Sequence, residues 1–586
     1  MTARPAAADD LAPLAAQAGL AKGPMGDAGS GDAVARLKAA IQDLKAHAVT
    51  PLLHQAVAAM REARWADGTA AILKALEADE TNGLAWHLLA ICLEKSGDVA
   101  SALDAYETAL KLRPEEHGIA NDLGRLAHRL GHNELAEKLF HHFLLREPGH
   151  VEAVNNLACA LRDMDRQGEA IELLRTVIQA RPEHPVLWNT LATVLSEKGD
   201  MEGSLPFFDE ALRLDPGFAK ARYNRANAIL ALGRSEEALA ELEAALPGAQ
   251  PGYETDMMRL ARAFALLRVG RLKEGFDEYE VRFSKEALDT VHFATDLPRW
   301  SPDDDLTGKS LLVSAEQGLG DEVLFMNVIP DLLEALGPEG RLHLAVERRL
   351  VPLVQRSFPG VTVAAHKTLN VSGKVVRFLP WPDDQGFDLF TPIASLWRRF
   401  RSRPEAFPQR PAFLTAEPAR VAHWKAQLDA LGPGYKVGLL WKSLKTAGAR
   451  SRHYSAFEQW RPVLETPGAV MVNLQYGDCS DELAQARKLG VDVWSPPGID
   501  LKDDLDEVAA LSCALDLVMG PANATQNIAA ASGANVWMMA SPEAWTVFGA
   551  ENCPAYPVMR VFHAPTFREW DVVIGEMAAA LRAEIG

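Results

Sequence analysis

Apolar and polar positions recur with a period of 34 residues between about 83 and 218. Four consecutive windows begin at residues 83, 117, 151 and 185, and the same columns are filled in each of them. The seventh position is always leucine, the eighth and twentieth positions are small, and a proline lies near the end of each window, at Pro114, Pro148, Pro182 and Pro216. A repeat of this length predicts one pair of antiparallel helices per window, stacked into a solenoid.

The details of the columns are typical of tetratricopeptide repeats. Small residues at the eighth and twentieth positions let paired helices approach closely, and aromatic residues fill the spaces between them, at Trp86, Trp188, Tyr106, Phe140 and Phe208. The frame continues less regularly over 49–82 and 219–252, as the capping repeats of a solenoid do. We therefore predict a flexible leader and N-terminal helix over 1–48, an array over 49–252, and a helical junction over 253–300.

One polar column of the array suggests how it binds a partner. The fifth position of successive windows reads His87, Asn121, Asn155, Asn189 and Tyr223. Asparagine amides both donate to and accept from an extended peptide backbone, so this column predicts a ladder that grips a protein. We assign acceptor binding to the column and its neighbours, at Asn121, Asn155, Asn156, Asn189 and Asn224. The alternative is that these are simply polar positions on exposed helices.

Beyond Trp300 the pattern changes to short apolar runs that alternate with amphipathic segments, which predicts parallel α/β sheets. The expected strands cover 309–315, 341–346, 361–365, 436–441, 470–475, 515–519 and 536–539. A stretch rich in proline and arginine, 401–418, separates two groups of strands, so we predict one Rossmann-like lobe over 301–415 and a second over 416–586. Such lobes place ligands at the carboxyl ends of their strands, in the cleft between them.

Composition narrows the classes of function. Hydrophobic residues make up 48% of the chain and charged residues 24%, as in ordinary globular proteins. The formal net charge of -19 argues against a nucleic-acid partner. The five cysteines are scattered, and no secretory signal or stretch of about twenty apolar residues is found. We therefore expect a cytoplasmic protein without a membrane span.

The loop Glu316-Gln-Gly-Leu-Gly-Asp321 carries the best chemical signal. Its glycines, Gly318 and Gly320, allow close approach of the backbone to a ligand. Asp321 lies at the start of the following helix, where a carboxylate is suited to act as general base on an acceptor hydroxyl. The alternative is that Asp321 only caps the helix.

Two further segments follow predicted strands of the second lobe. The first carries Lys442, Lys445, Arg450, Arg452 and His453, which suit phosphate or carboxylate groups. A solvated basic loop is the alternative. The second is Gly520-Pro-Ala-Asn-Ala-Thr-Gln-Asn527, whose Asn523, Thr525 and Asn527 are suited to the ribose and phosphate of a nucleotide at a helix N-terminus. Capping alone is again the alternative.

These motifs, in this order, resemble bacterial proteins that fuse tetratricopeptide repeats to a GT-B glycosyltransferase module. The resemblance runs from about 49 to the C-terminus and includes Glu274-Gly-Phe, Gly308-Lys-Ser-Leu-Leu-Val, Gly438-Leu-Leu-Trp-Lys442, Asn473-Leu-Gln-Tyr-Gly-Asp478, Asn535-Val-Trp and Cys553-Pro-Ala-Tyr-Pro557. It is strongest for the flagellin glycosyltransferase type and extends to the layout of O-GlcNAc transferase. The Gly-Asp loop is also similar to that of heptosyltransferases.

The resemblance implies a metal-independent protein O-glycosyltransferase without a cofactor. Its repeats would bind flagellin, and its lobes would transfer a nonulosonic acid such as pseudaminic acid from a CMP-linked donor to Ser or Thr. It implies that Asp321 is the base and extends the donor site to Trp441 and Gln475. With the motifs above, the donor-binding set becomes Gly318, Gly320, Trp441, Lys442, Lys445, Arg452, Gln475, Asn523, Thr525 and Asn527.

One departure from the family's pattern leaves alternatives open. Related modules carry Asp-Thr-x-x-x-His where this chain has Ala522-Asn-Ala-Thr-Gln-Asn527. Either the donor differs, as a CMP-linked acidic sugar would, or the site has lost activity. The alternatives are therefore an adaptor or chaperone that binds flagellin with an inactive or nucleotide-sensing half, and an enzyme like the UDP-GlcNAc-dependent O-GlcNAc transferase.

Overall fold

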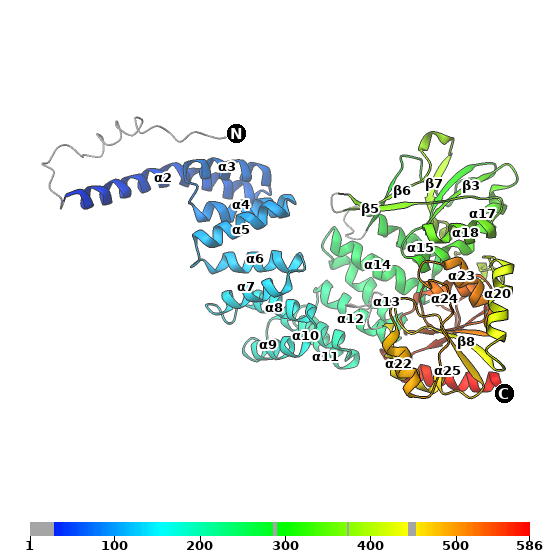
Figure 1. The fold of residues 1–586 in the computed structure, drawn as a ribbon. Helices are drawn as coiled ribbons and strands as arrows, with labels where there is room; N and C mark the ends of the chain where they lie inside the picture. The colour runs from blue at the N-terminus through cyan, green and yellow to red at the C-terminus, as the bar shows by residue number, and fades with distance from the viewer. Residues whose placement is uncertain (1–28, 285–289, 372–373, 444–452) are drawn as a thin grey trace. The chain divides into compact units, whose positions relative to one another are not determined.

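The computed structural model of the chain describes residues 29–284, 290–371, 374–443 and 453–586 (Figure 1). They form two compact units, Met1–Ala180 and Arg181–Gly586, which are described separately below. This division falls within the range 49–252 that the repeat pattern assigns to one array, and the predicted domain limits stay predictions.

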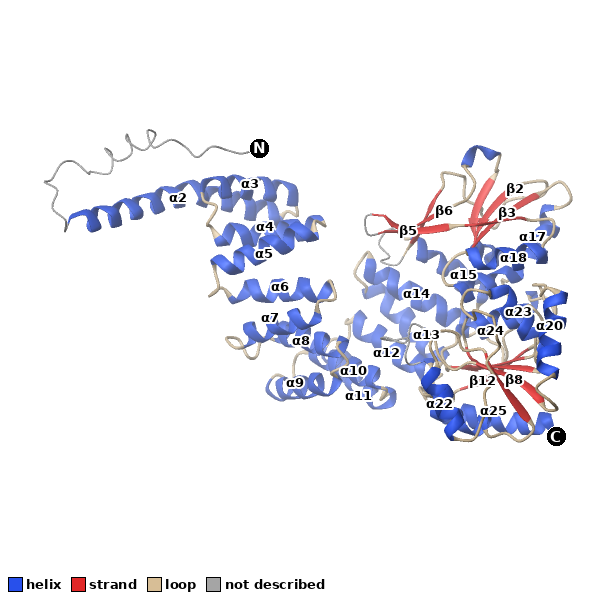
Figure 2. Ribbon diagram, in the orientation of Figure 1, coloured by secondary structure: helices blue, strands red, loops and turns tan. Residues whose placement is uncertain are grey.

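The described part of the first unit is helical (Figure 2). Its helices are α2 (Gly29–Arg61), α3 (Trp65–Ala78), α4 (Gly83–Ser96), α5 (Val99–Leu112), α6 (His117–Arg129), α7 (Asn133–Leu144), α8 (Val151–Asp163) and α9 (Gln167–Ala180). The ends follow the local sequence. Asn82 caps α4 by accepting a hydrogen bond from the Ala85 N–H at 2.9 Å, and Gly97 ends α4 with a φ of 86°.

The small columns of the repeat explain how paired helices pack. Ala90, Ala102 and Ala136 are fully buried, as are the aromatic Tyr106 and Phe140. A Cβ atom added to Gly124 would lie 2.8 Å from the Phe140 ring, so α6 and α7 are as close as a glycine allows. The predicted tetratricopeptide solenoid is confirmed in this respect, because each small column lies at a contact between helices.

The second unit begins with further helix pairs. They are α10 (Pro185–Lys198), α11 (Met201–Leu214), α12 (Ala219–Ala231), α13 (Ser235–Ala245), α14 (Tyr253–Arg268) and α15 (Leu272–Tyr279), followed by the 3-10 turn η3 (Glu280–Phe283). Trp188 differs from its expected role. It is only half-buried, and its indole N–H donates to the Pro182 carbonyl at 2.7 Å, so it anchors the start of α10.

A four-stranded parallel sheet follows, in the order β4-β3-β2-β7. Its strands are β2 (Ser310–Ser314), β3 (Arg341–Val346), β4 (Thr362–Ala365) and β7 (Leu389–Pro392). Its helices are α16 (Leu319–Phe325), α17 (Ile329–Leu336), α18 (Val351–Ser357) and α19 (Trp397–Phe400). A 3-10 turn at Met326–Val328, just before Pro330, separates α16 from α17.

A small sheet, in the order β1-β6-β5, lies outside the predicted pattern. Its strands are β1 (Val291–Ala294), β5 (Lys367–Val371) and β6 (Lys374–Phe378), with β5 antiparallel to β6. Every residue of β5 is exposed. In β5 the apolar Leu369 and Val371 alternate with polar residues, but the run is short and both side chains are exposed, so it does not mark a buried strand face.

The C-terminal sheet has five parallel strands in the order β12-β11-β10-β8-β9. They are β8 (Tyr435–Leu439), β9 (Ala469–Asn473), β10 (Leu517–Pro521), β11 (Val536–Ala540) and β12 (Met559–His563). The accompanying helices are α20 (Pro418–Asp429), α21 (Arg461–Leu464), α22 (Ser480–Lys488), α23 (Leu505–Ala514), α24 (Ala524–Ala531) and α25 (Trp570–Ile585). Parallel sheets are confirmed on both sides of the linking stretch, although β7 and β12 were not predicted.

One hydrophobic core joins the last helices of the junction to both parallel sheets. Phe276 of α15 packs against Trp397, with ring centroids 5.5 Å apart, and against Phe548, at 6.0 Å. Phe407 of the linking stretch stacks on Phe548 at 5.2 Å. The backbones of Gly270 and Gly549 come so close that a Cβ atom on Gly549 would lie 2.7 Å from the Gly270 Cα. Residues 253–283 are therefore built into the same core as the sheets.

Across the described residues, none of the helices combines the length and the apolar character that crossing a bilayer requires.

Candidate functional site

The loop between β2 and α16 holds Asp321 in a defined place. Gly318 is the N-cap of α16, and its N–H donates to the Asp321 carboxylate at 3.1 Å. Two buried tyrosines lie nearby. Burial raises the pKa of both Tyr279 and Tyr556, and the negative charge of Asp321 raises each pKa further. Asp321 therefore caps its helix, and its charge acts on both phenols.

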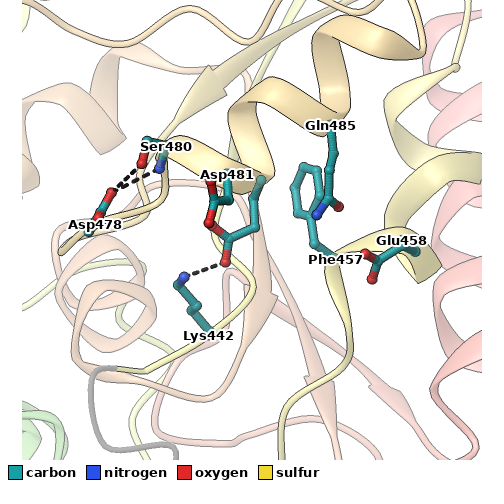
Figure 3. Close-up of a pocket in the computed structure, with 8 residues that line it drawn as sticks. Lys442, Phe457, Glu458, Asp478, Ser480, Asp481 and Gln485 are labelled. Atoms are coloured by element: carbon teal, nitrogen blue, oxygen red, sulfur yellow. Dashed lines mark hydrogen bonds and ion pairs between the residues drawn. The ribbon is translucent and has the colours of Figure 1, made fainter.

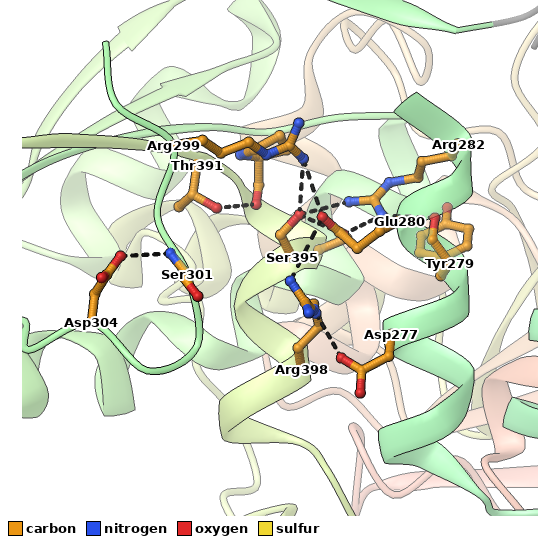
Figure 4. Close-up of polar contacts among 12 residues, drawn as sticks. Asp277, Tyr279, Glu280, Arg282, Arg299, Ser301, Asp304, Thr391, Ser395 and Arg398 are labelled. Carbon is orange, nitrogen blue, oxygen red and sulfur yellow. Dashed lines mark hydrogen bonds and ion pairs between the residues drawn. The ribbon is translucent and has the colours of Figure 1, made fainter. Parts of the chain in front are cut away.

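A buried ion pair fixes the start of this loop, and Figure 4 shows the contacts of its arginine, Arg282, with Glu280 and Ser395. Arg282 of η3 donates to both carboxylate oxygens of Glu316, at 2.8 and 2.9 Å. Glu316 also accepts the Ala394 N–H at 3.0 Å, and Ser395 links Arg282 to Glu280. Both Arg282 and Glu316 are buried, and such a pair is tolerated because nearly every polar atom has a partner. The junction thereby holds the loop that carries Asp321.

The segment before α24 meets the Gly-Asp loop. Asn523 caps α24 by accepting the Gln526 N–H at 3.1 Å, and Asn527 donates to the Asn523 carbonyl at 2.8 Å. The Tyr556 hydroxyl donates to Asn527 Oδ1 at 2.8 Å. A Cβ atom on Gly320 would lie 3.1 Å from Asn527 Nδ2. The structure thus brings together two of the predicted motifs, one from each parallel sheet.

Three of the predicted donor-binding residues are buried in the C-terminal lobe. Thr525 is buried in α24. Gln475 is buried, and its Oε1 accepts the N–H groups of Trp441 at 3.0 Å and of Lys442 at 2.9 Å. Trp441 is 1% exposed and packs on Phe457. Trp441 therefore offers almost no surface to a ligand. Its position at the end of a strand in the sequence does not reveal this burial.

Lys442 lines a pocket of about 280 Å³ on the C-terminal lobe (Figure 3). Its ammonium group pairs with Glu482, and the other acidic residues of the lining are Glu458, Asp478 and Asp481. Burial alone would raise the pKa of Glu482, but the hydrogen bond from Lys442 holds that pKa below its usual range. The described part of this expected anion site is therefore acidic overall. Lys445, Arg450 and Arg452 lie outside the described residues.

Some side chains of the asparagine column form hydrogen bonds to neighbouring asparagines within the array. Asn189 is buried, and its amide oxygen accepts from Asn224 Nδ2 at 2.9 Å. In the first unit, Asn155 Nδ2 donates to Asn156 Oδ1 at 3.5 Å. Among the described residues, Asn121 Oδ1 and Asn156 Nδ2 are buried without a hydrogen-bond partner. Binding of a protein along this column stays a prediction.

Sequence reasoning missed several residues around Asp321. Arg282 lies 34 residues before Glu316, so no local pattern links the two. Tyr556 belongs to the Cys553-Pro-Ala-Tyr-Pro557 motif and Tyr279 to the predicted helical junction, but neither residue carries a chemical signal by itself. The backbone of Gln317 has a φ of 63°, which is uncommon for a residue with a side chain. Among the residues around Asp321, only Glu316 has a signal in the sequence, because it is a charged residue directly after an apolar strand.

The repeats and the two parallel sheets define a tetratricopeptide-repeat protein with a C-terminal α/β region. Family models for the tetratricopeptide repeat match residues 83–116, 121–185 and 189–254. The chain belongs to the FlbA family: it is 51% identical to Protein FlbA of Caulobacter vibrioides over 560 residues, which cover 95% of this chain and 94% of that protein.

Other similarities are confined to part of the chain. It is 33% identical over 79 residues to the peroxisomal targeting signal receptor of Kluyveromyces lactis, covering 14% of each protein. A crystal structure of a tetratricopeptide repeat protein from Parabacteroides merdae matches with a TM-score of 0.37 and 17% identity. That match covers 41% of this chain and 95% of the other.

Proposed function

We propose that this protein is an O-glycosyltransferase that modifies a bound protein. Its repeats hold the acceptor, which we take to be flagellin, and its two sheets form a GT-B module. The module transfers a nonulosonic acid such as pseudaminic acid from a CMP-linked donor to Ser or Thr. The observation that carries the proposal is the meeting of two loops: Asp321 follows a strand of one parallel sheet, and Gly320 of the same loop lies against Asn527, which follows a strand of the other.

In the proposed reaction Asp321 takes the proton of the acceptor hydroxyl. The freed oxygen attacks the anomeric carbon of the sugar, and the bond to the CMP phosphate breaks with its electrons on that phosphate. The hydrogen bond from the Gly318 N–H holds the Asp321 carboxylate at the start of α16, in the loop where we place the acceptor hydroxyl. Holding both substrates in one site lowers the entropic part of the barrier.

The donor phosphate needs positive charge in this mechanism. Because Lys442 is already paired with Glu482, we assign neutralisation of the phosphate mainly to Lys445 and Arg452, which belong to the same loop. Titration calorimetry with CMP, UDP and GDP distinguishes a CMP-linked donor from a UDP-linked one.

A second function is favoured by the acidic pocket and by the departure at Ala522 and Asn527. In that case the protein binds flagellin as an adaptor, and its α/β region carries out no transfer. The lining of the Lys442 pocket, with Glu458, Asp478 and Asp481 beside the Lys442–Glu482 pair, is the specific observation in its favour, because these carboxylates repel phosphate.

The intact mass of flagellin distinguishes the two functions. We expect wild-type protein to add one sugar mass per modified Ser or Thr, and Asp321→Asn to slow transfer by about 10²- to 10⁴-fold while flagellin still binds. Asp384→Asn, at an exposed aspartate of the same lobe, is the matched control and keeps full activity. Full activity of Asp321→Asn removes that residue as the base. Binding without any added mass, even by wild-type protein, favours the adaptor.

A further inference from the structure

A pocket of about 210 Å³ lies between the helical junction and the Asp321 loop. One face of α14 forms a wall, with residues spaced at helical intervals: Tyr253, Met257, Leu260 and Phe264. Tyr279, Val281 and Gln317 line the same pocket, and so do the polar residues Asp256, Arg282 and Thr290. Gln317 lies four residues before Asp321, so the pocket borders the loop that carries the proposed base.

The pocket lies on the column that the repeats define. Successive members of this column are 34 residues apart, and Met257 comes one period after Tyr223. In the structure Tyr223 of α12 packs against the cluster that contains Leu266 of α14, so the stacking of the repeats continues into α14. Within the second unit, Met257 is therefore the position that follows Tyr223 in the predicted binding column.

The chemistry of the column changes at this point. Asparagines, which bind backbone amides, give way to Tyr223 and then to Met257, whose thioether adapts to apolar groups. Phe264 closes the inner wall by packing against Tyr279 and Trp545, with both pairs of ring centroids 5.6 Å apart. Tyr253 is 48% exposed, and Gln317 is exposed too, so solvent reaches the pocket.

We propose that this pocket binds one large apolar side chain of the acceptor protein and thereby sets which Ser or Thr reaches Asp321; this rests on the proposed transferase function. The occupant is a leucine- to phenylalanine-sized side chain on an extended segment that continues along the repeats. The size is suitable, because an apolar cavity of about 150 Å³ holds a benzene molecule. A side chain buried in such a pocket acts as an anchor and positions the residues next to it.

Photo-crosslinking tests the occupant without requiring sugar transfer. The full chain with p-benzoylphenylalanine in place of Tyr253 is irradiated with purified flagellin, and the joined peptides are identified by mass spectrometry. We expect cross-links to one flagellin segment that carries a large apolar side chain and a modified Ser or Thr. The same photolabel at Val572, an exposed apolar residue of α25, is the control. Cross-links no stronger than those from Val572, or cross-links to a second copy of this chain, overturn the inference.

A second variant tests whether the pocket directs the reaction. Met257→Glu places a carboxylate in the apolar wall, so we expect KM for flagellin to rise about tenfold with kcat unchanged, while Val572→Glu changes neither. Unchanged KM in Met257→Glu overturns the inference. If protein that adds no sugar still cross-links to the expected segment, the pocket assignment stands and the proposed transferase function is rejected. Sugar transfer without the cross-link rejects the pocket alone.

Discussion

Asp331 shows how one carboxylate can tie the first parallel sheet to the stretch that leaves it. It begins the first turn of α17 and binds both Arg401, which is 1% exposed, and Arg410. Burial alone would raise the pKa of Asp331, but hydrogen bonds from Arg410 and Arg401 hold that pKa below the usual range. The charged form is therefore the one that stabilises the fold.

The lowered pKa of Asp331 makes the stability of the fold depend on pH, with a definite sign. Because the pKa of Asp331 is lower in the folded state, its contribution is complete above pH about 4 and is lost as the pH falls through the folded-state pKa. Asp331→Asn should cost about 1–3 kcal/mol at pH 7 and less at pH 3. Thermal melting at both pH values checks this, with Asp384→Asn as the exposed control. A gap between wild type and Asp331→Asn that stays constant with pH contradicts it.

The Gly-Asp loop also shows the limit of sequence reasoning about single residues. The position of Asp321 at a helix start could be read from its neighbours, because glycines and a preceding strand mark such a turn. The partner of Glu316 could not, because Arg282 comes from a different element and reaches Glu316 only after the chain folds.

At the scale of elements, α6 offers a matched pair of glycines. Gly124 faces α7, where a Cβ atom would lie 2.8 Å from the Phe140 ring, whereas no atom lies within 4 Å of a Cβ atom on Gly118. We expect Gly124→Ala to destabilise the repeat by about 1–3 kcal/mol through overpacking. Gly118→Ala should be neutral or slightly stabilising because alanine favours helices. Hydrogen exchange of peptides from α6 and α7 measures both. Equal protection in the two variants would argue against close packing as the reason for the small column.

Helices and strands could be predicted where burial produces a regular pattern of apolar residues in the sequence. Strands β2, β3 and β8 were found within about two residues, because a strand covered on both faces is a continuous apolar run. The hairpin of β5 and β6 was not predicted, because each strand has only five residues and β5 buries neither face. The division between α16 and α17 leaves no signal in the sequence, since the intervening turn keeps the apolar residues that a continuous helix would have.

For the whole molecule, the aromatic core around Phe276 decides which parts unfold together. Phe276→Ala removes contacts with Trp397 and Phe548, so we expect a loss of about 3–5 kcal/mol. Hydrogen exchange should then accelerate together in α14, α15 and the segments around Trp397 and Phe548. Phe207→Ala, at a half-buried ring stacked on Trp188, is the control and should affect only its own repeat. Acceleration confined to α15 would show that the junction unfolds by itself.

The contact between Gly270 and Gly549 has a consequence for how the family can diverge. Both residues adopt positive φ values, 85° and 78°, which side chains rarely tolerate, and a Cβ atom on Gly549 would in addition clash with the backbone of Gly270. A substitution at either site is harmful by itself, and no second substitution at the other site relieves it. We expect both positions to stay glycine in relatives that keep this junction, even where the exposed helix faces around them have drifted.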